Sequence, residues 1–520
     1  METLTSYVLG EWRAGDGAAT ALFNPTTEET IGQVRSGGYD PARVLAFARE
    51  TGGTALRAMT FGERAAALKA LSKAIYSKRD ELLDLSIRAA GTTRGDAKFD
   101  IDGATGTLAA YAAYGEALGS RRWLVDGDGV QLGRTPRFWG EHVLVPRLGA
   151  AFHVNAFNFP AWNMLEKAAC ALLAGTPVIE KPGTPTAMVA WRIAQIIAES
   201  GVLPKGAYQL VVGSASAFLD HLNSQDSIAF TGSSATAALL RGHANVVRNN
   251  VRVNLEADSL NAAVLGPDVE IGAESFGLFR SNVTLDMTQK TGQKCTAVRR
   301  ILVPKDRIAD VRDELAAILA DTRVGDPALN ETRMGPLASK QQLDDVRAGI
   351  ARLEKECDVA TGGSATAVGG AKAIQQKGYF VAPTLCVARD GRASVVHDHE
   401  VFGPVATIVP YSGDASEAAS LVALGGGGLV ASVYSDDPAW TQSLVVGIAP
   451  WSGRVWIGSE KLADQGTAPG TVLPASIHGG PGRAGGGEEL GGLRGLEFYL
   501  QRTALQGYQG FVQSVFAPKA

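Results

Sequence analysis

The 520-residue sequence has only four cysteines, Cys170, Cys295, Cys357 and Cys386. They form no CxxC pair and have no histidine pattern nearby, so their spacing argues against a zinc site. Four cysteines in a chain of this length also do not suggest a disulfide scaffold, and a reducing cytoplasm fits best. We therefore expect a cytoplasmic protein without a metal centre.

Long apolar runs and a strong charge of one sign are also missing. No uninterrupted apolar run reaches the roughly 18 residues that a membrane helix needs. The N-terminus lacks the basic segment and apolar core of a signal peptide. The formal net charge of -4 gives no electrostatic reason to bind nucleic acid or an anionic membrane. We expect neither of these partners.

The sequence also lacks a convincing phosphate-binding loop. It contains no GxxxxGK[ST] motif. A literal G-x-G-x-x-G spans Gly480–Gly485, but it includes Pro481 and does not follow a strand within a βαβ unit. We therefore reject it as a dinucleotide fingerprint. The glycine-rich stretch 470–495 instead predicts an active-site loop.

What the sequence has is a regular alternation of strands and helices, typical of βαβ units around a parallel sheet. The composition, 45% hydrophobic and 20% charged, is that of a globular protein, and the length favours two or three domains. We expect two α/β domains that join near Glu256. The expected strands are 149–156, 177–181, 208–212, 227–231 and 251–256, then 299–303, 405–411, 429–434 and 454–457. Helices are expected over 55–95 and 102–118 and from about 162, 187, 216 and 234.

Polar residues cluster where the strands of the first predicted sheet end. Asn158, Lys181, the Thr231-Gly232-Ser233 triplet and Glu256 lie at or just beyond these ends. In open α/β sheets this edge holds the ligand crevice. Helix N-termini also point to this edge and favour an anionic ligand such as a cofactor pyrophosphate.

Cys295 and Glu256 suggest a two-step reaction, in which a thiol forms a covalent adduct and a carboxylate activates the water that cleaves it. Most free cysteines are small buried hydrophobes, but small and polar neighbours favour an exposed thiol here. Lys294 would lower the pKa of this thiol if it pointed inward. His397 and His399 keep a thiol hydrolase open as an alternative, although we favour surface loop positions for both.

Six ordered motifs resemble those of the NAD(P)-dependent aldehyde dehydrogenase superfamily, over nearly the whole chain. They are Phe157–Pro160, Glu180–Pro182, Phe230–Ser233, Leu255-Glu256, Gly292–Cys295 and Glu400–Val405. The resemblance implies an α/β aldehyde dehydrogenase fold with two Rossmann-like parallel-sheet domains and a β-arm for oligomerisation. It places the cofactor-binding domain at 1–132 and 149–255, the catalytic domain at 256–470, and bridging segments at 133–148 and 485–520. Exposed strands near 137–146 and 498–505 predict a homodimer, with a tetramer as the alternative.

The resemblance also implies roles for individual residues. Cys295 would attack the aldehyde, and Asn158 with the Cys295 backbone N–H would form the oxyanion hole. After hydride transfer, Glu256 would activate water to hydrolyse the thioester. The implied cofactor-binding residues are Lys181, Thr184, Gly213, Thr231, Gly232, Ser233, Glu256, Glu400 and Phe402.

Thr184 bears on the choice of cofactor. Many NAD-preferring members of the family carry Glu three residues after the lysine that corresponds to Lys181. A hydroxyl in its place removes repulsion against a 2′-phosphate. We therefore predict that NADP is used and preferred, with NAD possible.

The substrate is predicted from two unusual segments, Ala257–Asn261 and the glycine-rich 478–492. They resemble a subgroup with the aldehyde dehydrogenase half of the bifunctional phenylacetate-degradation ring-opening enzyme and the semialdehyde dehydrogenase of benzoyl-CoA oxidation. Both oxidise CoA-thioester semialdehydes. CoA-acylating dehydrogenation, or a different aliphatic or aromatic aldehyde, remains an alternative. The bifunctional relative continues into a hydratase domain, an activity we do not expect here.

Overall fold

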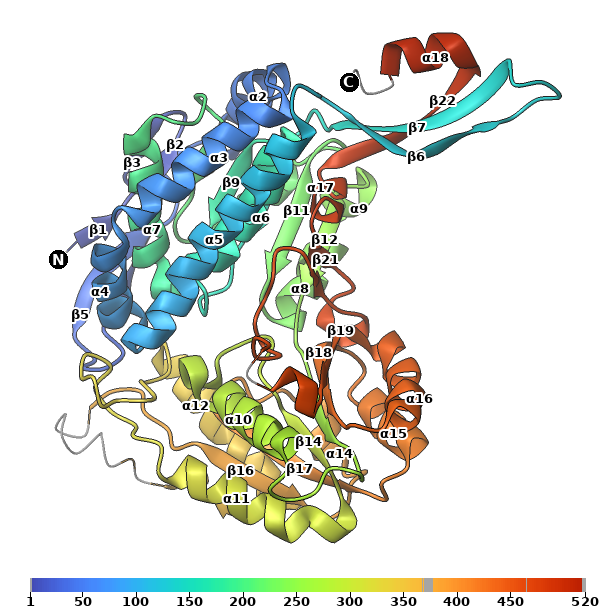
Figure 1. The fold of residues 1–520 in the computed structure, drawn as a ribbon. Coiled ribbons are helices and arrows are strands. Elements are labelled where there is room, and N and C mark those ends of the chain that lie inside the picture. Colours follow the sequence, from blue (N-terminus) through green and yellow to red (C-terminus); the bar gives the residue numbers. More distant parts are fainter. Residues whose placement is uncertain (1, 367, 369–376, 464, 517–520) are drawn as a thin grey trace.

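The computed structural model describes residues 2–366, 368, 377–463 and 465–516. Two seven-stranded sheets, each flanked by helices, form the two main parts of the molecule (Figure 1). The predicted α/β class with two parallel-sheet domains is confirmed. Among the helices that the structure describes, none combines the length and the apolar character of a membrane-spanning segment.

The first sheet has the strand order β12-β11-β8-β9-β10-β2-β3. The first five strands in this order are parallel, and the two N-terminal strands complete the other edge in antiparallel orientation. Parallel strands covered on both faces need near-continuous apolar runs, which explains why they could be predicted. The bounds are β2 (Ser6–Val8), β3 (Glu11–Arg13), β8 (Ala151–Val154), β9 (Val178–Lys181), β10 (Tyr208–Leu210), β11 (Ser227–Thr231) and β12 (Arg252–Glu256).

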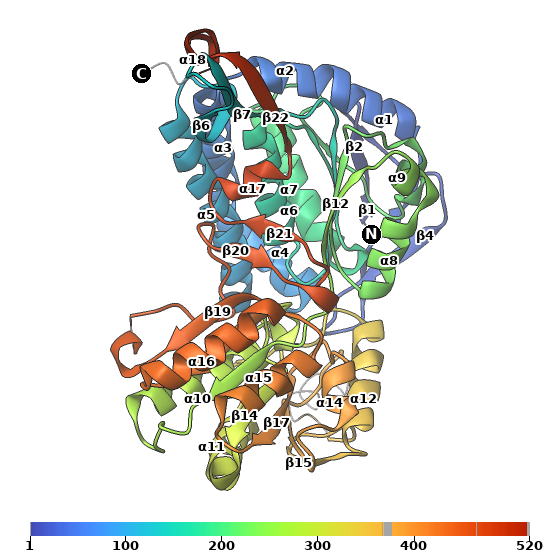
Figure 2. The same ribbon diagram turned by 90° about the vertical axis from the view of Figure 1, so that its right-hand side faces the viewer.

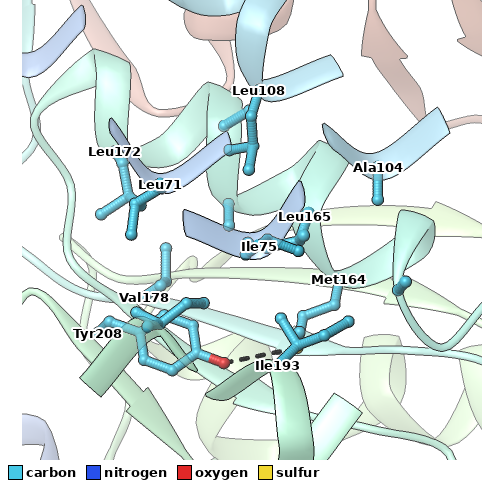
Figure 3. Close-up of a cluster of buried hydrophobic side chains, with 14 of the residues drawn as sticks. Leu71, Ile75, Ala104, Leu108, Met164, Leu165, Leu172, Val178, Ile193 and Tyr208 are labelled. Atoms are coloured by element: carbon cyan, nitrogen blue, oxygen red, sulfur yellow. Dashed lines mark hydrogen bonds between the residues drawn. The ribbon is translucent and has the colours of Figure 1, made fainter. Parts of the chain in front are cut away.

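Helices α3 (Phe61–Tyr76), α5 (Arg94–Leu118), α6 (Trp162–Ala174) and α7 (Ala187–Ser200) build the largest hydrophobic core. Figure 3 shows their side chains meeting those of the sheet, with the Tyr208 hydroxyl donating to the Met164 sulfur at 3.5 Å. The predicted helix 55–95 is wrong as a single element. It is divided into α2 (Gly53–Ala58), α3 and α4 (Arg79–Ala90), and a capping box of Thr60 and Glu63 starts α3.

The second sheet has the order β15-β16-β17-β14-β13-β18-β19. Strand β12 ends at Glu256, and the next strand, β13, already belongs to this second sheet. The strands are β13 (Ala262–Leu265), β14 (Arg300–Pro304), β15 (Cys357–Thr361), β16 (Thr384–Ala388), β17 (Val405–Tyr411), β18 (Gly428–Tyr434) and β19 (Ser452–Gly458). The helices are α10 (Glu274–Thr288), α11 (Ile308–Ala320), α12 (Lys340–Leu353), α14 (Ser394–Asp398), α15 (Ala415–Leu424) and α16 (Pro438–Ile448).

A three-stranded antiparallel arm of order β22-β7-β6 projects from the first domain (Figure 1). Its strands are β6 (Leu124–Gln131), β7 (Phe138–Pro146) and β22 (Leu500–Tyr508), and α18 (Gln509–Phe516) follows. The predicted boundary at 132 was too late, because β6 already belongs to the arm. The smaller elements are β1 (Glu2–Leu4), β4 (Ala19–Phe23), β5 (Thr30–Arg35), α1 (Pro41–Phe47), α8 (Ser234–Gly242), α9 (Ala244–Arg248) and α17 (Arg494–Glu497).

The glycine-rich stretch forms a hairpin of β20 (Ile477–Gly479) and β21 (Glu488–Leu490), beside β12 in Figure 2. The predicted bridging segment 485–520 was therefore too long at its start. The Gly487 amide donates to the Leu255 carbonyl at 3.1 Å. A Cβ atom on Gly487 would come within 2.5 Å of the same oxygen, closer than carbon and oxygen can approach. Glycine thus lets the hairpin lie against the strand that ends at Glu256.

Candidate active site

Cys295 follows a tight turn between α10 and β14. In this turn Lys290 and Thr291 have positive φ angles of 53° and 57°, which residues with a side chain rarely adopt. The turn is fixed by Arg299, which donates to the carbonyls of Gly292 at 2.9 Å and Lys294 at 3.2 Å. These contacts hold the partly exposed Cys295 thiol at a defined place on the cavity wall.

The thiol meets Glu256 and a histidine, His478. Nε2 of His478 lies 3.9 Å from the Cys295 sulfur and 3.3 Å from Oε1 of Glu256. The Thr231 hydroxyl donates to Oε2 of Glu256 at 3.2 Å. The structure therefore brings together the two residues predicted to react. Among the described residues, these three side chains also form the only group close enough to share a metal ion, and we assign them to the reaction instead.

The charges of the three groups depend on one another. Burial and then the negative charge of Glu256 raise the pKa of the Cys295 thiol well above 9. Burial alone would raise the pKa of Glu256, but His478 and Lys167 lower it to about 2. Burial lowers the pKa of the His478 imidazole, whereas the nearby negative charge of Glu256 raises it, and the net shift is upward. These shifts favour a protonated thiol, an ionised carboxylate and a charged imidazole in the resting site.

Lys294 and His397 both bind groups other than the thiol. The condition under which Lys294 would act on the sulfur is not met, because its ammonium donates to Asp286 at 2.8 Å and to Gln289 at 2.9 Å. The prediction of a surface position for His397 was wrong. This histidine is buried, its Nε2 lies 2.9 Å from the Gly391 carbonyl oxygen, and its Nδ1 is 3.0 Å from Arg300. The histidine that reaches the thiol is His478, from the stretch predicted as an active-site loop.

A buried charge network below Glu256 was also missed. Lys167 on α6 donates to the Thr231 hydroxyl at 2.9 Å and lies 3.2 Å from Glu489 and 3.6 Å from Glu166. Burial raises the pKa of Glu166 to about 7. Polar residues inside an otherwise apolar helix were the available signal, since such groups need partners when buried.

Asn158 lines the cavity beside Cys295, as its proposed role in the oxyanion hole requires. Its side-chain amide is buried and donates to the Gln293 carbonyl at 3.0 Å. Because an amide nitrogen carries two hydrogens, the second remains available to a substrate oxygen. The bond to Gln293 fixes the orientation of the group before a substrate arrives.

The cavity that Cys295 lines has a volume of about 690 Å³ and brings together most of the predicted cofactor residues. Within the described part of the chain, Thr184 and Gly213 do not line it, whereas the neighbouring Gly183 and Pro185 do. Burial lowers the pKa of Lys181. The predicted residues on the cavity wall are Asn158, Lys181, Thr231, Gly232, Ser233, Glu256, Cys295, Glu400 and Phe402.

Glu400 is held on the cavity wall by two donors from the second domain. The Ser259 amide donates to one oxygen at 2.9 Å, and Arg299 donates to the other at 3.3 Å. Phe402 packs edge-on against Phe157, with ring centroids 6.0 Å apart. Arg299 thus orients Glu400 as well as the turn that carries Cys295.

The unusual Ala257-Asp258 pair has two structural roles. The Ala257 amide donates to the Ala484 carbonyl of the glycine-rich hairpin at 3.0 Å. Asp258 accepts from the Ser234 amide at 3.0 Å and from its hydroxyl at 2.6 Å, at the start of α8. A carboxylate therefore already occupies the positive end of this helix. The expectation that helix N-termini favour an anionic ligand at this edge is therefore weakened for α8.

The comparisons with known proteins agree with this geometry. The family model described as "Aldehyde dehydrogenase family" matches residues 12–505. The chain belongs to the aldehyde dehydrogenase family. A 3,4-dehydroadipyl-CoA semialdehyde dehydrogenase from Aromatoleum evansii is 47% identical over 481 residues, which cover 92% of this chain and 93% of that protein. The predicted family and its subgroup are thereby confirmed.

Solved structures show the same aldehyde dehydrogenase fold. An NAD-dependent aldehyde dehydrogenase from Sinorhizobium meliloti gives a TM-score of 0.84 at 23% identity, covering 98% of this chain and 95% of the other. The NAD+ complex of an aldehyde dehydrogenase from Bacillus cereus gives a TM-score of 0.82 at 22% identity. The match covers 98% of this chain and 97% of the other. At such low identity the likeness supports the fold alone.

Glu400 makes stability depend on pH. Burial, only partly offset by Arg299, raises its pKa to about 7, above the value near 4.3 of an unfolded glutamate. The folded state therefore binds this proton more tightly, and stability falls as pH rises from about 4.3 to 7. We expect Glu400→Gln to reduce the loss in free energy of unfolding between pH 5 and pH 8 by ~1–3 kcal/mol. Urea unfolding at the two pH values measures this difference. An unchanged difference between the two pH values would contradict this assignment.

Proposed function

We propose that this aldehyde dehydrogenase oxidises a CoA-thioester semialdehyde to the carboxylic acid by a covalent, hydrolytic route. The observation that carries the proposal is the meeting of Cys295 and Glu256 on the wall of one cavity. The name of the Aromatoleum evansii relative supports the class of substrate. A different aliphatic or aromatic aldehyde is the alternative.

Cys295 would act first, as the nucleophile. Its sulfur attacks the aldehyde carbon, while the Asn158 amide and the Cys295 backbone N–H donate to the developing oxyanion. When bound, the nicotinamide cofactor supplies the hydride acceptor. A thioester then forms on the Cys295 sulfur, beside the Glu256 carboxylate and the Asn158 amide.

Glu256 would act second, as the base that activates water. Its carboxylate is ionised and lies beside the thiol, on the same cavity wall. This placement supports hydrolysis over CoA-acylating dehydrogenation, where a thiol takes the acyl group and no water-activating base is needed. Consumption of free CoA during turnover would favour the acylating reaction instead.

The two roles predict different defects. Cys295→Ala should abolish turnover, because no covalent adduct can form. Glu256→Gln should lower the steady-state rate by about 10²–10⁴-fold but keep a burst of reduced cofactor, because only the water step loses its base. Stopped-flow absorbance with a CoA-linked semialdehyde and NADP measures both. Steady-state rates like the wild type in the Glu256 variant would remove this residue from its role.

We further propose that NADP is the preferred cofactor, with Lys181 binding its 2′-phosphate. Lys181 lines the cavity, and the following segment, Pro182–Pro185, brings no carboxylate beside it. Such a charged contact contributes ~1.5–3 kcal/mol. Lys181→Met should thus lower kcat/KM about 10- to 100-fold with NADP and much less with NAD. Equal losses with both cofactors, or a wild-type preference for NAD, would contradict the proposal.

We also propose a homodimer that assembles through the arm. The arm and α18 leave large apolar side chains exposed, among them Phe138, Tyr508 and Phe511. Apolar strands and helices of this kind need a partner. Light scattering should give the mass of a dimer for the wild type and a lower average mass for Phe511→Glu. A monomeric wild type at micromolar concentration would disprove the dimer.

A further inference from the structure

His478 lies where a catalytic group would lie, although the proposed reaction uses only Cys295 and Glu256. Its Nε2 faces both residues, at 3.9 Å from the sulfur and 3.3 Å from the carboxylate oxygen. The side chain is almost completely buried. A buried imidazole that touches both reacting groups is placed to act on each of them.

The hairpin fixes this position through its register. His478 and Glu489 are directly paired across the β20–β21 ladder, so their side chains lie on one face. Glu489 reaches Lys167, and its other oxygen accepts from Asn254 on β12 at 3.2 Å. The Glu488 amide donates to the same asparagine at 2.9 Å. The hairpin is thus held to the strand that carries Glu256, and His478 has a fixed place beside it.

His478 lies nearest to Oε1 of the Glu256 carboxylate. This oxygen is buried and has no hydrogen-bond partner of good geometry among the described residues. Its nearest cation is the His478 ring. Forming a thiolate next to this carboxylate would place two negative charges side by side, which is costly in a buried site. A cation that can turn between the two groups removes that cost.

We propose that His478 is a third catalytic residue, whose imidazolium N–H moves between Glu256 at rest and the Cys295 thiolate during the reaction. In acylation the S–H bond breaks, the proton leaves for solvent water, and His478 donates to the sulfur as it attacks. In deacylation Glu256 takes a proton from water, and the C–S bond breaks. His478 donates to the departing sulfur, which receives the proton from Glu256.

The proposal rests on the proposed use of Cys295 and Glu256, but its test needs neither aldehyde nor cofactor. Iodoacetamide alkylates thiolates, so its rate with Cys295 reports the fraction of thiolate at each pH. The charged or titratable groups near His478 are Glu256 on β12, Cys295 in its turn, Glu166 on α6, Arg454 on β19 and, across its own hairpin, Glu489. None of them is changed in a His478 variant.

His478→Gln keeps a hydrogen-bond donor but removes the positive charge. We expect it to move the alkylation profile of Cys295 upward by about one pH unit, which lowers the rate about tenfold at neutral pH. The burst of reduced cofactor should slow by a similar factor. His243→Gln is the matched control, because this histidine also faces a carboxylate, Asp220 at 3.6 Å, but lies away from the cavity.

An unchanged alkylation profile in both His478→Gln and His478→Asn would overturn the proposal. Thermal unfolding and NADP binding measured on the same samples show whether a slow variant is merely misfolded. The alkylation profile could shift although the wild type oxidises no aldehyde. The proposed function would then be wrong, whereas the action of His478 on the Cys295 thiol would still be supported.

Discussion

The close backbone contact between the glycine-rich hairpin and strand β12 is the constraint on which the site depends. The strand ends at Glu256, and the hairpin carries His478 and Glu489. Since Gly487 bonds to the Leu255 carbonyl without room for a side chain, the distances among the catalytic groups are set by backbone. In a phosphate-binding loop, glycines let the backbone approach a ligand. Here they let the hairpin backbone approach the protein's own strand β12.

Charge balance is the second constraint on this site. Glu256, Glu166 and Glu489 gather around Lys167 and His478, all of them buried. Burial leaves Glu166 with a pKa of about 7, whereas Glu256 stays ionised because two cations lie near it. An ionised carboxylate is the form in which Glu256 can act as the base of the water step. The network thus connects α6, through Thr231, to the Glu256 carboxylate.

Much of this arrangement could be predicted from sequence. Strand β17 was predicted at both ends, and the strand ends that carry Lys181, Thr231 and Glu256 were correctly placed at one crevice, because buried parallel strands have a strong apolar signal. The histidine and the buried network could not be found in this way. Cys295 and His478 are separated by 183 residues, and their contact depends on the register of a short hairpin. Asp258 is unusual in the sequence, but only the structure reveals that it accepts from the Ser234 amide.

The central claim is that Cys295 carries the acyl group and that Glu256 activates the water which releases it. Intact-protein mass spectrometry of Glu256→Gln, incubated with a CoA-linked semialdehyde and NADP, tests this claim most directly. The account predicts an added mass equal to the acyl group, located on the peptide that contains Cys295 and absent from a Cys295→Ala, Glu256→Gln double variant. An unmodified Cys295 in a variant that has reduced one equivalent of cofactor would contradict it.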